Sequence, residues 1–554
     1  MLPSKLSWRR RSPRGGGLAV ALLVTVCCGE EASAPPPVDA GSGVDAALDA
    51  AADAPRDAAS DVGADVGTGA DAADAVADAA DAAADAADAA PPPIACTVVA
   101  SSLADLSRAL AAPAPGSTVC LADGTYADAN LVFTAPGTAA QPIVITAQNP
   151  GRAILTGQTQ ISMGGAFATL QGFVIQGGQS LGGSLIELKN GRTSCDGCRV
   201  TEVAILDVDA GNPNDTKWVS LYGQRNRVDH CAFSGKTSQG TVLVVWRSSA
   251  RTDDHRIDHN LFANRPAIGS NGNEAIRVGT GAEASSDSRT IIEENLFEAM
   301  NGDAEFISIK SGANTVRHNT IRRSKGTLTL RNGAGSTVDA NIILTEGVAD
   351  AGGIRVIGPR HRVTNNYVEG VRSTSSARGA LSLVAGKLDP GPGEYAPVRD
   401  ALVAFNTIVD CEQSLILGAV LDPQSTLAPE NVTLANNLVS AARGSVAAPG
   451  AGLTTPSVFG NFYFGAPLGF SPAAGFTEID ARLTRAPGGL MRPSAGSPAV
   501  DAASGAAAVT ADIDGQARSG AFDVGCDEVG APGPVRGPLG RADVGPTRWR
   551  VTVP

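Results

Sequence analysis

The segments that decide the fold read Glu294-Asn-Leu-Phe297, His318-Asn-Thr-Ile321 and Ala340-Asn-Ile-Ile343. The same pattern, an Asn or Cys followed by a mostly apolar pair, occurs nine times between residues 229 and 463, at spacings of 22 to 40 residues. A base period in the low twenties with loop insertions predicts the coils of a parallel β-helix. An Asn at a fixed place in each coil predicts a stacked ladder, with left-handed backbone geometry at that Asn. The Leu-x-x-Leu-x-Leu frame of a leucine-rich repeat is absent. We therefore predict an all-β, right-handed parallel β-helix.

Both ends of the repeat region carry signals for closure. Ser101–Leu110 has leucines at amphipathic-helix spacing and precedes short strand-like segments, so we expect an N-terminal helical cap over the first coil. Segments around Asp512 and Asp527 resemble the closing region of many β-helix carbohydrate-active proteins. We therefore predict one β-helix domain over 94–530, followed by a loosely held Pro/Gly-rich tail over 531–554.

The N-terminal residues predict export. Basic residues are followed by the apolar run Leu18–Val26, which ends at Cys27-Cys28 and is too short for a comfortable membrane span. We read residues 1–28 as a signal peptide, and the cysteines resemble those of a bacterial lipoprotein signal. Residues 29–93 are rich in Asp and Ala and cannot form a core, so we predict a disordered linker. We expect a secreted or outer-surface lipoprotein of a bacterium, with lipid anchorage to its membrane.

Charge and cysteines limit the choice of function. The chain has a formal charge of −13, but residues 32–93 hold thirteen Asp and one Arg, so the region from 94 onward is close to neutral. This balance gives no support for nucleic-acid binding and does not exclude an anionic substrate. For an exported chain we expect disulfides between Cys96 and Cys120 and within Cys195-Asp-Gly-Cys198. The remaining thiols are expected to be buried and free; they are Cys231, Cys411 and Cys526.

Chemistry-bearing residues gather between 271 and 332. Asn271 lies upstream of Asp303 and Glu305, and Lys310 and Arg331 follow in apolar, strand-like surroundings. Oxygen ligands beside two cationic side chains suit chemistry on an acidic substrate through a bound divalent cation. In strict strand alternation Lys310 faces away from Asp303 and Glu305, so a corner or bulge must lie between Glu305 and Lys310.

From about Thr97 to Leu383 the chain resembles polysaccharide lyase family six, which contains chondroitinase B and alginate lyases. The resemblance rests on the order and spacing of six motifs: Ala122-Asp-Gly-Thr-Tyr126, Pro142-Ile-Val-Ile-Thr-Ala147, Ile276-Arg-Val-Gly279, Glu305-Phe-Ile-Ser-Ile-Lys-Ser311, Leu330-Arg-Asn-Gly333 and Gly352-Gly-Ile-Arg-Val356. It implies β-elimination at a uronic acid. In this reaction a base removes the C5 proton, the C4–O bond breaks, and calcium neutralises the carboxylate.

The resemblance also implies residue roles. Asn271, Asp303 and Glu305 match the calcium ligands, although the family usually has Glu at the position of Asp303. Lys310 matches the base, and its pKa must lie below the free-lysine value of about 10.4 for it to act near neutral pH. Arg331 matches the position assigned as general acid, and we expect it to stabilise the leaving oxygen. The substrate-binding positions are Arg355, Arg378 and Asn332, the last replacing a common His.

The prediction is a calcium-dependent lyase for a uronate-containing acidic polysaccharide. Alginate is the first choice, because the stretch around Arg355 looks alginate-type, and chondroitin or dermatan sulfate is the closest alternative. Two other classes stay open. One is a glycoside hydrolase that uses paired carboxylates on the same fold. The other is a non-catalytic polysaccharide-binding module. No protein partner is predicted.

Overall fold

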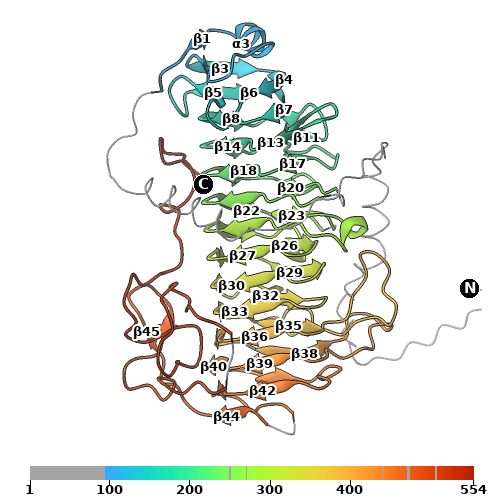
Figure 1. Cartoon of the computed structure of the whole chain (residues 1–554), viewed down its shortest axis with the longest axis vertical. Helices are drawn as coiled ribbons and strands as arrows, with labels where there is room; N and C mark the ends of the chain where they lie inside the picture. Colours follow the sequence, from blue (N-terminus) through green and yellow to red (C-terminus); the bar gives the residue numbers. More distant parts are fainter. Residues whose placement is uncertain are drawn as a thin grey trace, which may run out of the picture. The chain divides into compact units, whose positions relative to one another are not determined.

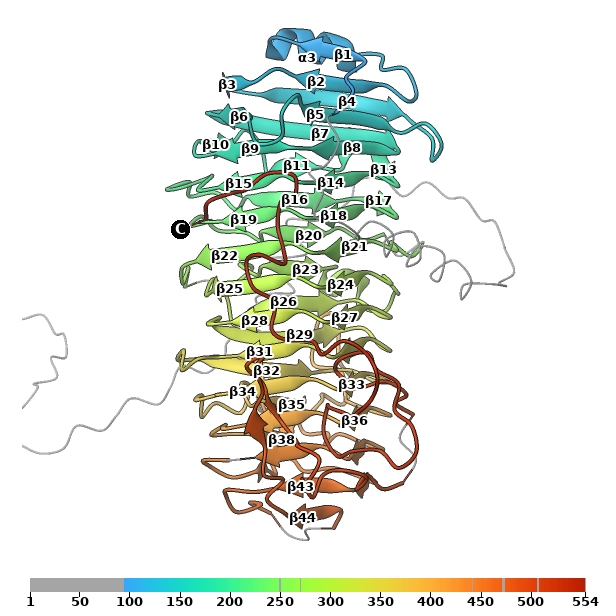
Figure 2. The same cartoon turned by 90° about the vertical axis from the view of Figure 1, so that its left-hand side faces the viewer.

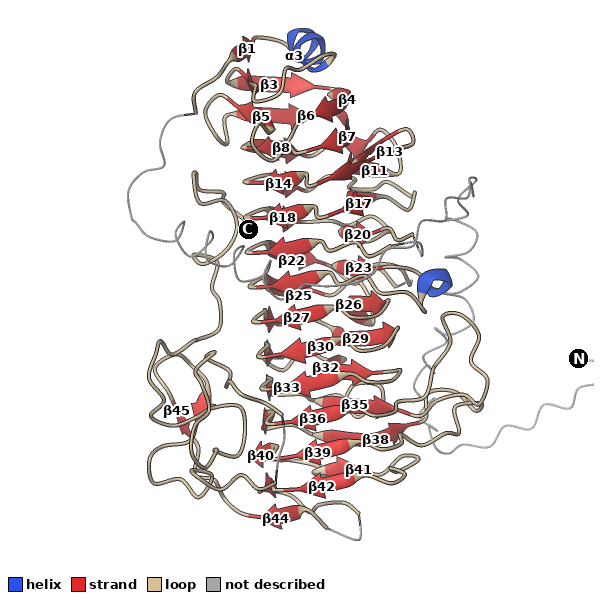
Figure 3. Cartoon of the chain, viewed as in Figure 1, coloured by secondary structure: helices blue, strands red, loops and turns tan. Residues whose placement is uncertain are grey.

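The computed structural model describes residues 94–248, 251–269, 271–440, 442–470, 474–505 and 508–553. The predicted signal peptide and linker, residues 1–28 and 29–93, lie outside this part of the chain. The described residues form three long sheets whose successive strands come from successive coils, which confirms the prediction of a parallel β-helix (Figure 1, Figure 3). Among these residues no helix has the length and apolar character that a membrane span requires.

The three sheets are called the first, second and third sheet below. The first sheet contains β1 (Val98–Ala100), β2 (Thr118–Leu121), β5 (Ile143–Ala147), β8 (Ala168–Gln171), β14 (Arg199–Thr201), β18 (Arg227–Asp229), β21 (Arg256–Asp258), β24 (Ile291–Glu293), β27 (Thr315–Arg317), β30 (Thr337–Asp339), β33 (Arg362–Thr364), β36 (Leu402–Ala404), β39 (Thr433–Ala435) and β42 (Ser457–Phe459). The second contains β4 (Asn130–Pro136), β7 (Gln158–Ala166), β10 (Gln179–Ser180), β11 (Ser184–Glu187), β12 (Lys189–Asn190), β13 (Thr193–Asp196), β16 (Lys217–Leu221), β17 (Gly223–Gln224), β20 (Leu243–Val245), β23 (Ile276–Val278), β26 (Glu305–Lys310), β29 (Gly326–Asn332), β32 (Ala351–Val356), β35 (Leu381–Val384), β38 (Leu415–Ala419) and β41 (Ala447–Ala448). The third contains β3 (Gly124–Ala127), β6 (Ala153–Thr156), β9 (Phe173–Gln176), β15 (Ala204–Leu206), β19 (Ala232–Ser234), β22 (Leu261–Arg265), β25 (Leu296–Met300), β28 (Thr320–Arg322), β31 (Ile342–Leu344), β34 (Tyr367–Glu369), β37 (Thr407–Val409), β40 (Leu438–Ser440), β43 (Asn461–Tyr463) and β44 (Phe476–Glu478).

One coil passes from the first sheet through the third to the second, as β24, β25 and β26 do, and β27 then stacks on β24 in parallel register. Like side chains therefore lie above one another inside the coils. The rings of Phe233, Phe262 and Phe297 stack with centroids 5.0 and 4.9 Å apart, and all three are buried. This interior stacking of apolar side chains is the core that the repeat pattern predicts.

The predicted asparagine ladder is present at the corner between the first and third sheets. Asn319 Oδ1 accepts hydrogen bonds from the backbone N–H and the side chain of Asn295, and Asn319 Nδ2 donates to Asn341 Oδ1 at 2.9 Å. The ladder consists of Asn260, Asn295, Asn319, Asn341, Asn366, Asn406, Asn437 and Asn461. The predicted left-handed position was wrong by one residue. Positive φ falls on the residue before each Asn, as at Glu294 (53°) and His318 (54°), because the corner must turn before the Asn side chain enters the coil.

Asn319→Ala is expected to lower the free energy of unfolding by about 3 kcal/mol, because the buried groups it bonds lose their partners. These groups include the Asn295 amide and the carbonyl of Ile292. The urea midpoint, followed by circular dichroism, measures the loss. Asn130→Ala, at an exposed position on β4, is the control and should change stability by less than about 0.5 kcal/mol. Equal midpoints for the two variants would contradict a stabilising ladder.

The N-terminal end is capped as predicted. The helix α3 (Leu103–Leu110) begins at Ser102, whose side chain accepts a hydrogen bond from the Asp105 N–H, and it buries Leu106 and Leu110. Disulfides join Cys96 to Cys120 and Cys195 to Cys198. The remaining cysteines of the described residues are free and buried, in agreement with the sequence analysis; they are Cys231, Cys411 and Cys526.

The C-terminal tail is not loosely held. Beyond the hairpin of β45 (Thr484–Arg485) and β46 (Met491–Arg492), the chain returns along the third sheet (Figure 2). The Glu202 carboxylate accepts hydrogen bonds from the backbone N–H groups of Thr547 and Arg548, and Gly545 N–H donates to the His259 carbonyl at 2.8 Å. Val544 packs on the exterior of the same sheet. The Pro/Gly-rich composition suggested a loose tail. The residues that hold the tail lie several hundred positions earlier in the sequence, so no local signal indicates them.

Candidate active site

The predicted site lies on the outer face of the second sheet. Arg277 on β23, Thr329 on β29 and Arg355 on β32 occupy one line across the sheet, joined through Ser308 of β26. Their neighbours Ile309 and Leu330 are buried in the core. Strand alternation therefore places the polar side chains outward while the aliphatic ones anchor each strand.

Two bulges bring Lys310 and Arg331 together. The register between β26 and β29 shifts once between Glu305 and Ile307 and again between Ile309 and Lys310. The first shift inserts Phe306 as an extra residue and places Lys310 on the same side of the sheet as Glu305. This is the bulge that strand alternation predicted between these two residues. The second leaves Arg331 as the extra residue on β29, opposite Lys310. Bulges of this kind re-aim side chains beside functional sites.

Buried carboxylates form one end of the site. Asp303 Oδ2 accepts the Asn273 N–H at 2.8 Å, and its Oδ1 accepts the Ala304 N–H at 2.6 Å. Burial, followed by the charge of Glu274, raises the pKa of Asp303 to about 7. Burial also raises the pKa of Glu274, although Lys310 acts in the opposite direction. Charge repulsion between buried acids is what a cation or a proton at this place relieves.

Glu305 is already neutralised by an arginine. Arg355 Nη2 forms an ion pair with Glu305 Oε1, and both side chains are buried. Burial disfavours the Glu305 carboxylate, but Arg355 and then Arg331 outweigh it and lower its pKa. A residue predicted to bind substrate therefore contacts a predicted calcium ligand. Sequence reasoning missed this contact, because the two positions lie on strands two coils apart.

Arg331 is held in an unusual way. Its guanidinium carbon lies 4.6 Å from the ring centroid of Tyr395, and the side chain is 2% exposed. Among the described residues, neither Nη1 nor Nη2 of Arg331 has a hydrogen-bond partner. Stacking on the ring fixes the guanidinium plane without using its donors. The donors therefore remain available to an oxygen atom of a ligand.

Tyr395 is a residue of the candidate site that the sequence analysis missed. It belongs to the loop between β35 and β36, far along the chain from Arg331, and Asn332 Nδ2 donates to the carbonyl of its neighbour Glu394 at 3.0 Å. The Glu394 side chain accepts a hydrogen bond from Lys387 at 2.7 Å, which closes the loop on itself. The sequence signal that could have indicated Tyr395 was the rarity of tyrosine, because the chain contains only five tyrosines.

The other predicted residues lie at the margin of the cluster. Asn271 is exposed, and its carbonyl accepts a hydrogen bond from Asn273 Nδ2 at 3.4 Å. Asn273, not Asn271, donates to Asp303. Its own side-chain oxygen is engaged by Arg265 Nη2 at 3.1 Å. Arg378 is partly buried and reaches Asp350 at 3.4 Å. The structure thus brings Asp303, Glu305, Lys310, Arg331, Asn332 and Arg355 together and leaves Asn271 and Arg378 outside their direct contacts.

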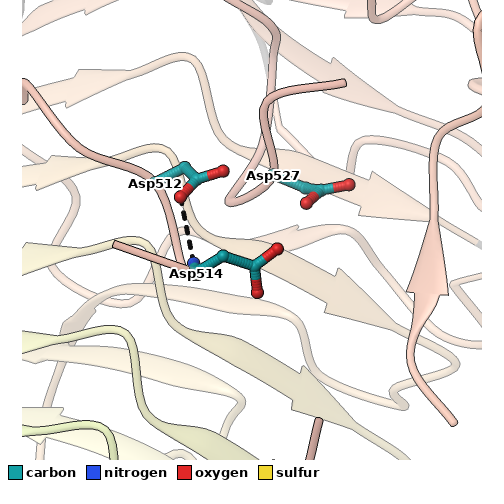
Figure 4. Close-up of side chains that lie close together, drawn as sticks. All are labelled: Asp512, Asp514 and Asp527. Atoms are coloured by element: carbon teal, nitrogen blue, oxygen red, sulfur yellow. Dashed lines mark hydrogen bonds between the residues drawn. The ribbon is translucent and has the colours of Figure 1, made fainter. Parts of the chain in front are cut away.

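The chemistry of this donor set fits a hard divalent cation. Asp303 and the neighbouring Glu274 supply carboxylate oxygens, and Glu274 Oε2 is buried without a hydrogen-bond partner within the described ranges. The acids of the site do not, however, form a tight triad. The described residues hold one set of three acids whose oxygens lie within 4.8 Å of one another, which is Asp512, Asp514 and Asp527 (Figure 4). That set belongs to the C-terminal segment, where Arg492 pairs with Asp514 at 2.8 Å and also with Asp527.

The candidate site therefore consists of a buried lysine, an arginine and carboxylates on one outer sheet face of a parallel β-helix. A family model described as chondroitinase B matches residues 99–447. The chain therefore belongs to polysaccharide lyase family 6, whose members are enzymes that cleave polysaccharides, and the resemblance found in the sequence is confirmed.

Two solved structures show this kinship. The PL6 family alginate lyase AlyGC is 30% identical, with 82% of this chain and 59% of that chain covered and a TM-score of 0.71. A mannuronic acid specific family 6 lyase from human gut microbiota is 28% identical, with 69% of this chain and 91% of that chain covered and a TM-score of 0.61. The chain thus matches only about three fifths of the length of AlyGC. A comparison with curated proteins gave no match.

Proposed function

We propose that this protein cleaves a uronate-containing acidic polysaccharide, with alginate as the substrate, by β-elimination. One observation carries the proposal. Arg331 presents two buried donor nitrogens, which have no partner among the described residues, in the bulge opposite Lys310. An acceptor of protons beside free donors is what elimination next to a carboxylate needs. The alginate and mannuronic acid lyases of similar structure support the choice of substrate.

In the proposed reaction the neutral amine of Lys310 takes the C5 proton of the uronate. The electron pair of the C5–H bond forms the C4–C5 double bond, and the C4–O bond breaks. Arg331 stabilises the leaving oxygen through its free N–H groups, while a water that it orients delivers the proton, because a guanidinium scarcely deprotonates. Asp303 and Glu274, together with the predicted ligands Glu305 and Asn271, would hold Ca²⁺, although Asn271 lies outside the direct contacts of the other three. The ion would supply positive charge beside the substrate carboxylate.

The test is the product. Purified protein is incubated with polymannuronate, polyguluronate, chondroitin sulfate and dermatan sulfate in the presence of Ca²⁺, and ultraviolet absorbance is followed. Elimination leaves a conjugated double bond, whereas a glycoside hydrolase produces new reducing ends without absorbance. We expect absorbance with an alginate polymer. Absorbance with the sulfated polymers instead would favour the chondroitinase alternative. These polymers are tested because the matching family model is described as chondroitinase B.

Chelation is expected to lower the rate by roughly 100-fold, because loss of a Lewis acid removes several kcal/mol of charge stabilisation. Added Ca²⁺ should restore activity. Asp303→Asn should remove this calcium response, whereas Asp514→Asn in the C-terminal triad should retain it. The rate measured against free Ca²⁺ concentration separates the variants. A response lost in Asp514→Asn alone would transfer the calcium requirement to the C-terminal triad.

We also propose that residues 1–28 direct the protein to the surface of a bacterium, with a lipid on Cys27 or Cys28. The proposal rests on the basic residues, apolar run and paired cysteines of this segment. Fractionation of cells that express the full chain tests it. The protein should sediment with membranes, and a variant with both cysteines replaced by Ala should appear in the soluble fraction.

A further inference from the structure

Arg265 is the last residue of β22, and its side chain is buried at the corner between the third and second sheets. Its Nη2 donates to the carbonyls of Ser238 and Gly240 at 3.2 and 2.7 Å, and to Asn273 Oδ1 at 3.1 Å. Ser238 and Gly240 belong to the loop between β19 and β20, one coil before the loop that carries Asn273. Arg265 therefore ties two successive coils together at this corner.

The same side chain packs against the next coil, which carries Asp303. Gly302 precedes Asp303 in the loop between β25 and β26. A Cβ atom on Gly302 would lie 2.2 Å from Arg265 Nε and 2.7 Å from Arg265 Cδ, so a side chain at this position would displace the arginine. The guanidinium group therefore lies against the backbone immediately before the Asp303 carboxylate.

Asn273 connects Arg265 to the side chain of Asp303. Its Oδ1 also accepts the Gly240 N–H at 3.0 Å, so the Asn273 side chain is fixed from two directions. The backbone N–H of Asn273 then donates to Asp303 Oδ2 at 2.8 Å. Because Asn273 is 1% exposed and Asp303 is 7% exposed, the orientation of the carboxylate depends on these protein contacts.

The way in which Arg265 is bonded does not fit a purely structural ion pair. Among the described residues its Nε and Nη1 have no hydrogen-bond partner, and Nη2 bonds only to neutral oxygens. Burial lowers the pKa of Arg265 to about 10, although the charges of Glu274 and Asp303 act in the opposite direction. The group is therefore a cation at neutral pH. A buried cation bonded in this way is costly, so its place beside the carboxylates calls for a role there.

We propose that Arg265 is a positioning residue for the Asp303 end of the site. By fixing Asn273, it holds the Asp303 carboxylate in the orientation that binds a divalent cation. The inference rests on the proposed calcium site and deepens it. Residues that orient metal ligands without touching the metal change its affinity by roughly 10–100-fold when they are lost.

Calorimetric titration of the whole protein with Ca²⁺, in the absence of any polymer, tests the role. Asp303→Asn gives the background from other acidic groups. For Arg265→Met we expect Ca²⁺ to bind about tenfold more weakly at the Asp303 site. Arg265→Gln, which is neutral and shorter, should show the same loss and serves as the test if Arg265→Met does not fold. Arg265→Lys should bind within about threefold of the wild type, because an ammonium group has three donors for the oxygens that Nη2 now bonds.

Two further variants separate positioning from a general loss of stability. Arg518 is also a buried arginine, but it pairs with Glu528 at 2.9 Å in the C-terminal segment. Arg518→Met should lower the unfolding temperature and leave Ca²⁺ affinity unchanged. The double variant Arg265→Met, Asn273→Ala should bind Ca²⁺ no more weakly than Asn273→Ala alone, because Arg265 acts through Asn273.

The outcomes distinguish this inference from the proposed function. If affinity depends on Arg265 as expected but no polymer gives an unsaturated product, the lyase function fails and the positioning role stands. If a polymer is cleaved and Arg265→Met and Arg265→Gln bind Ca²⁺ normally, the positioning role fails alone. Tighter binding by Arg265→Met would show that the charge of Arg265 opposes the cation, and additive losses in the double variant would exclude action through Asn273; either result overturns the role. A wild type without Asp303-dependent binding overturns both the calcium site and the role of Arg265.

Discussion

Lys310→Ala should lower kcat on the preferred polymer by about 10²–10⁴-fold, because it removes the proposed acceptor of the C5 proton. The side chain is 4% exposed and is placed beside Arg331 by the bulges of β26 and β29. A water molecule that replaces the amine lacks both its basicity and its fixed position. The initial rate of absorbance increase, at saturating substrate and Ca²⁺, measures the effect.

The control for this variant is Lys325→Ala. Lys325 is a nearby lysine on the loop before β29, where it pairs with Asp350 at 3.7 Å, and its loss should change kcat by less than about twofold. Substantial cleavage by Lys310→Ala would mean that another group is the base and would remove the central assignment of the site.

Arg331→Ala should lower kcat by roughly 10²–10³-fold, as expected when donors aimed at a developing negative charge are lost. KM should change less, because the proposed role of the donors is to stabilise the leaving oxygen in the transition state. The variant and the wild type are compared on the same polymer for kcat and KM separately. A rise in KM with unchanged kcat would assign Arg331 to ground-state binding instead.

The role of Tyr395 gives a matched pair for this experiment. Tyr395→Phe retains the ring that lies 4.6 Å from the Arg331 guanidinium and should keep most activity. Tyr395→Leu removes the ring and should lower kcat by about tenfold, because the guanidinium loses the contact that fixes its plane. Equal losses in both variants would instead indicate that the hydroxyl group takes part.

The fold could be predicted because its determinants are local and repeated. Each ladder asparagine is followed by apolar residues within one short motif, so the period is visible without any structure. The bulge near Lys310 was also predictable, since Asp303 and Glu305 have one parity and Lys310 the other. The left-handed residue was misplaced because Asn favours this geometry in general, whereas here its side chain is needed inside the corner.

The contacts that refine the site could not be predicted in the same way. Tyr395 reaches Arg331 from an insertion between β35 and β36, and nothing in the loop sequence specifies where it folds back. The ion pair of Glu305 with Arg355 depends on the register of β26, β29 and β32, which includes bulges on both ladders. A register shift of one residue there changes which side chains meet, and the short strand sequences do not specify that register.

The returning tail changes how the coils depend on one another. In a simple solenoid each repeat contacts only its neighbours, so unfolding can spread from an open end one coil at a time. Here Thr547 bonds Glu202, a partner 345 positions earlier in the sequence. A coil near the C-terminal end therefore cannot fray while the tail stays docked on early strands. The tail thus links the C-terminal coils to the coil that carries Glu202, and the coils between them, which carry the candidate site, gain a shared stability.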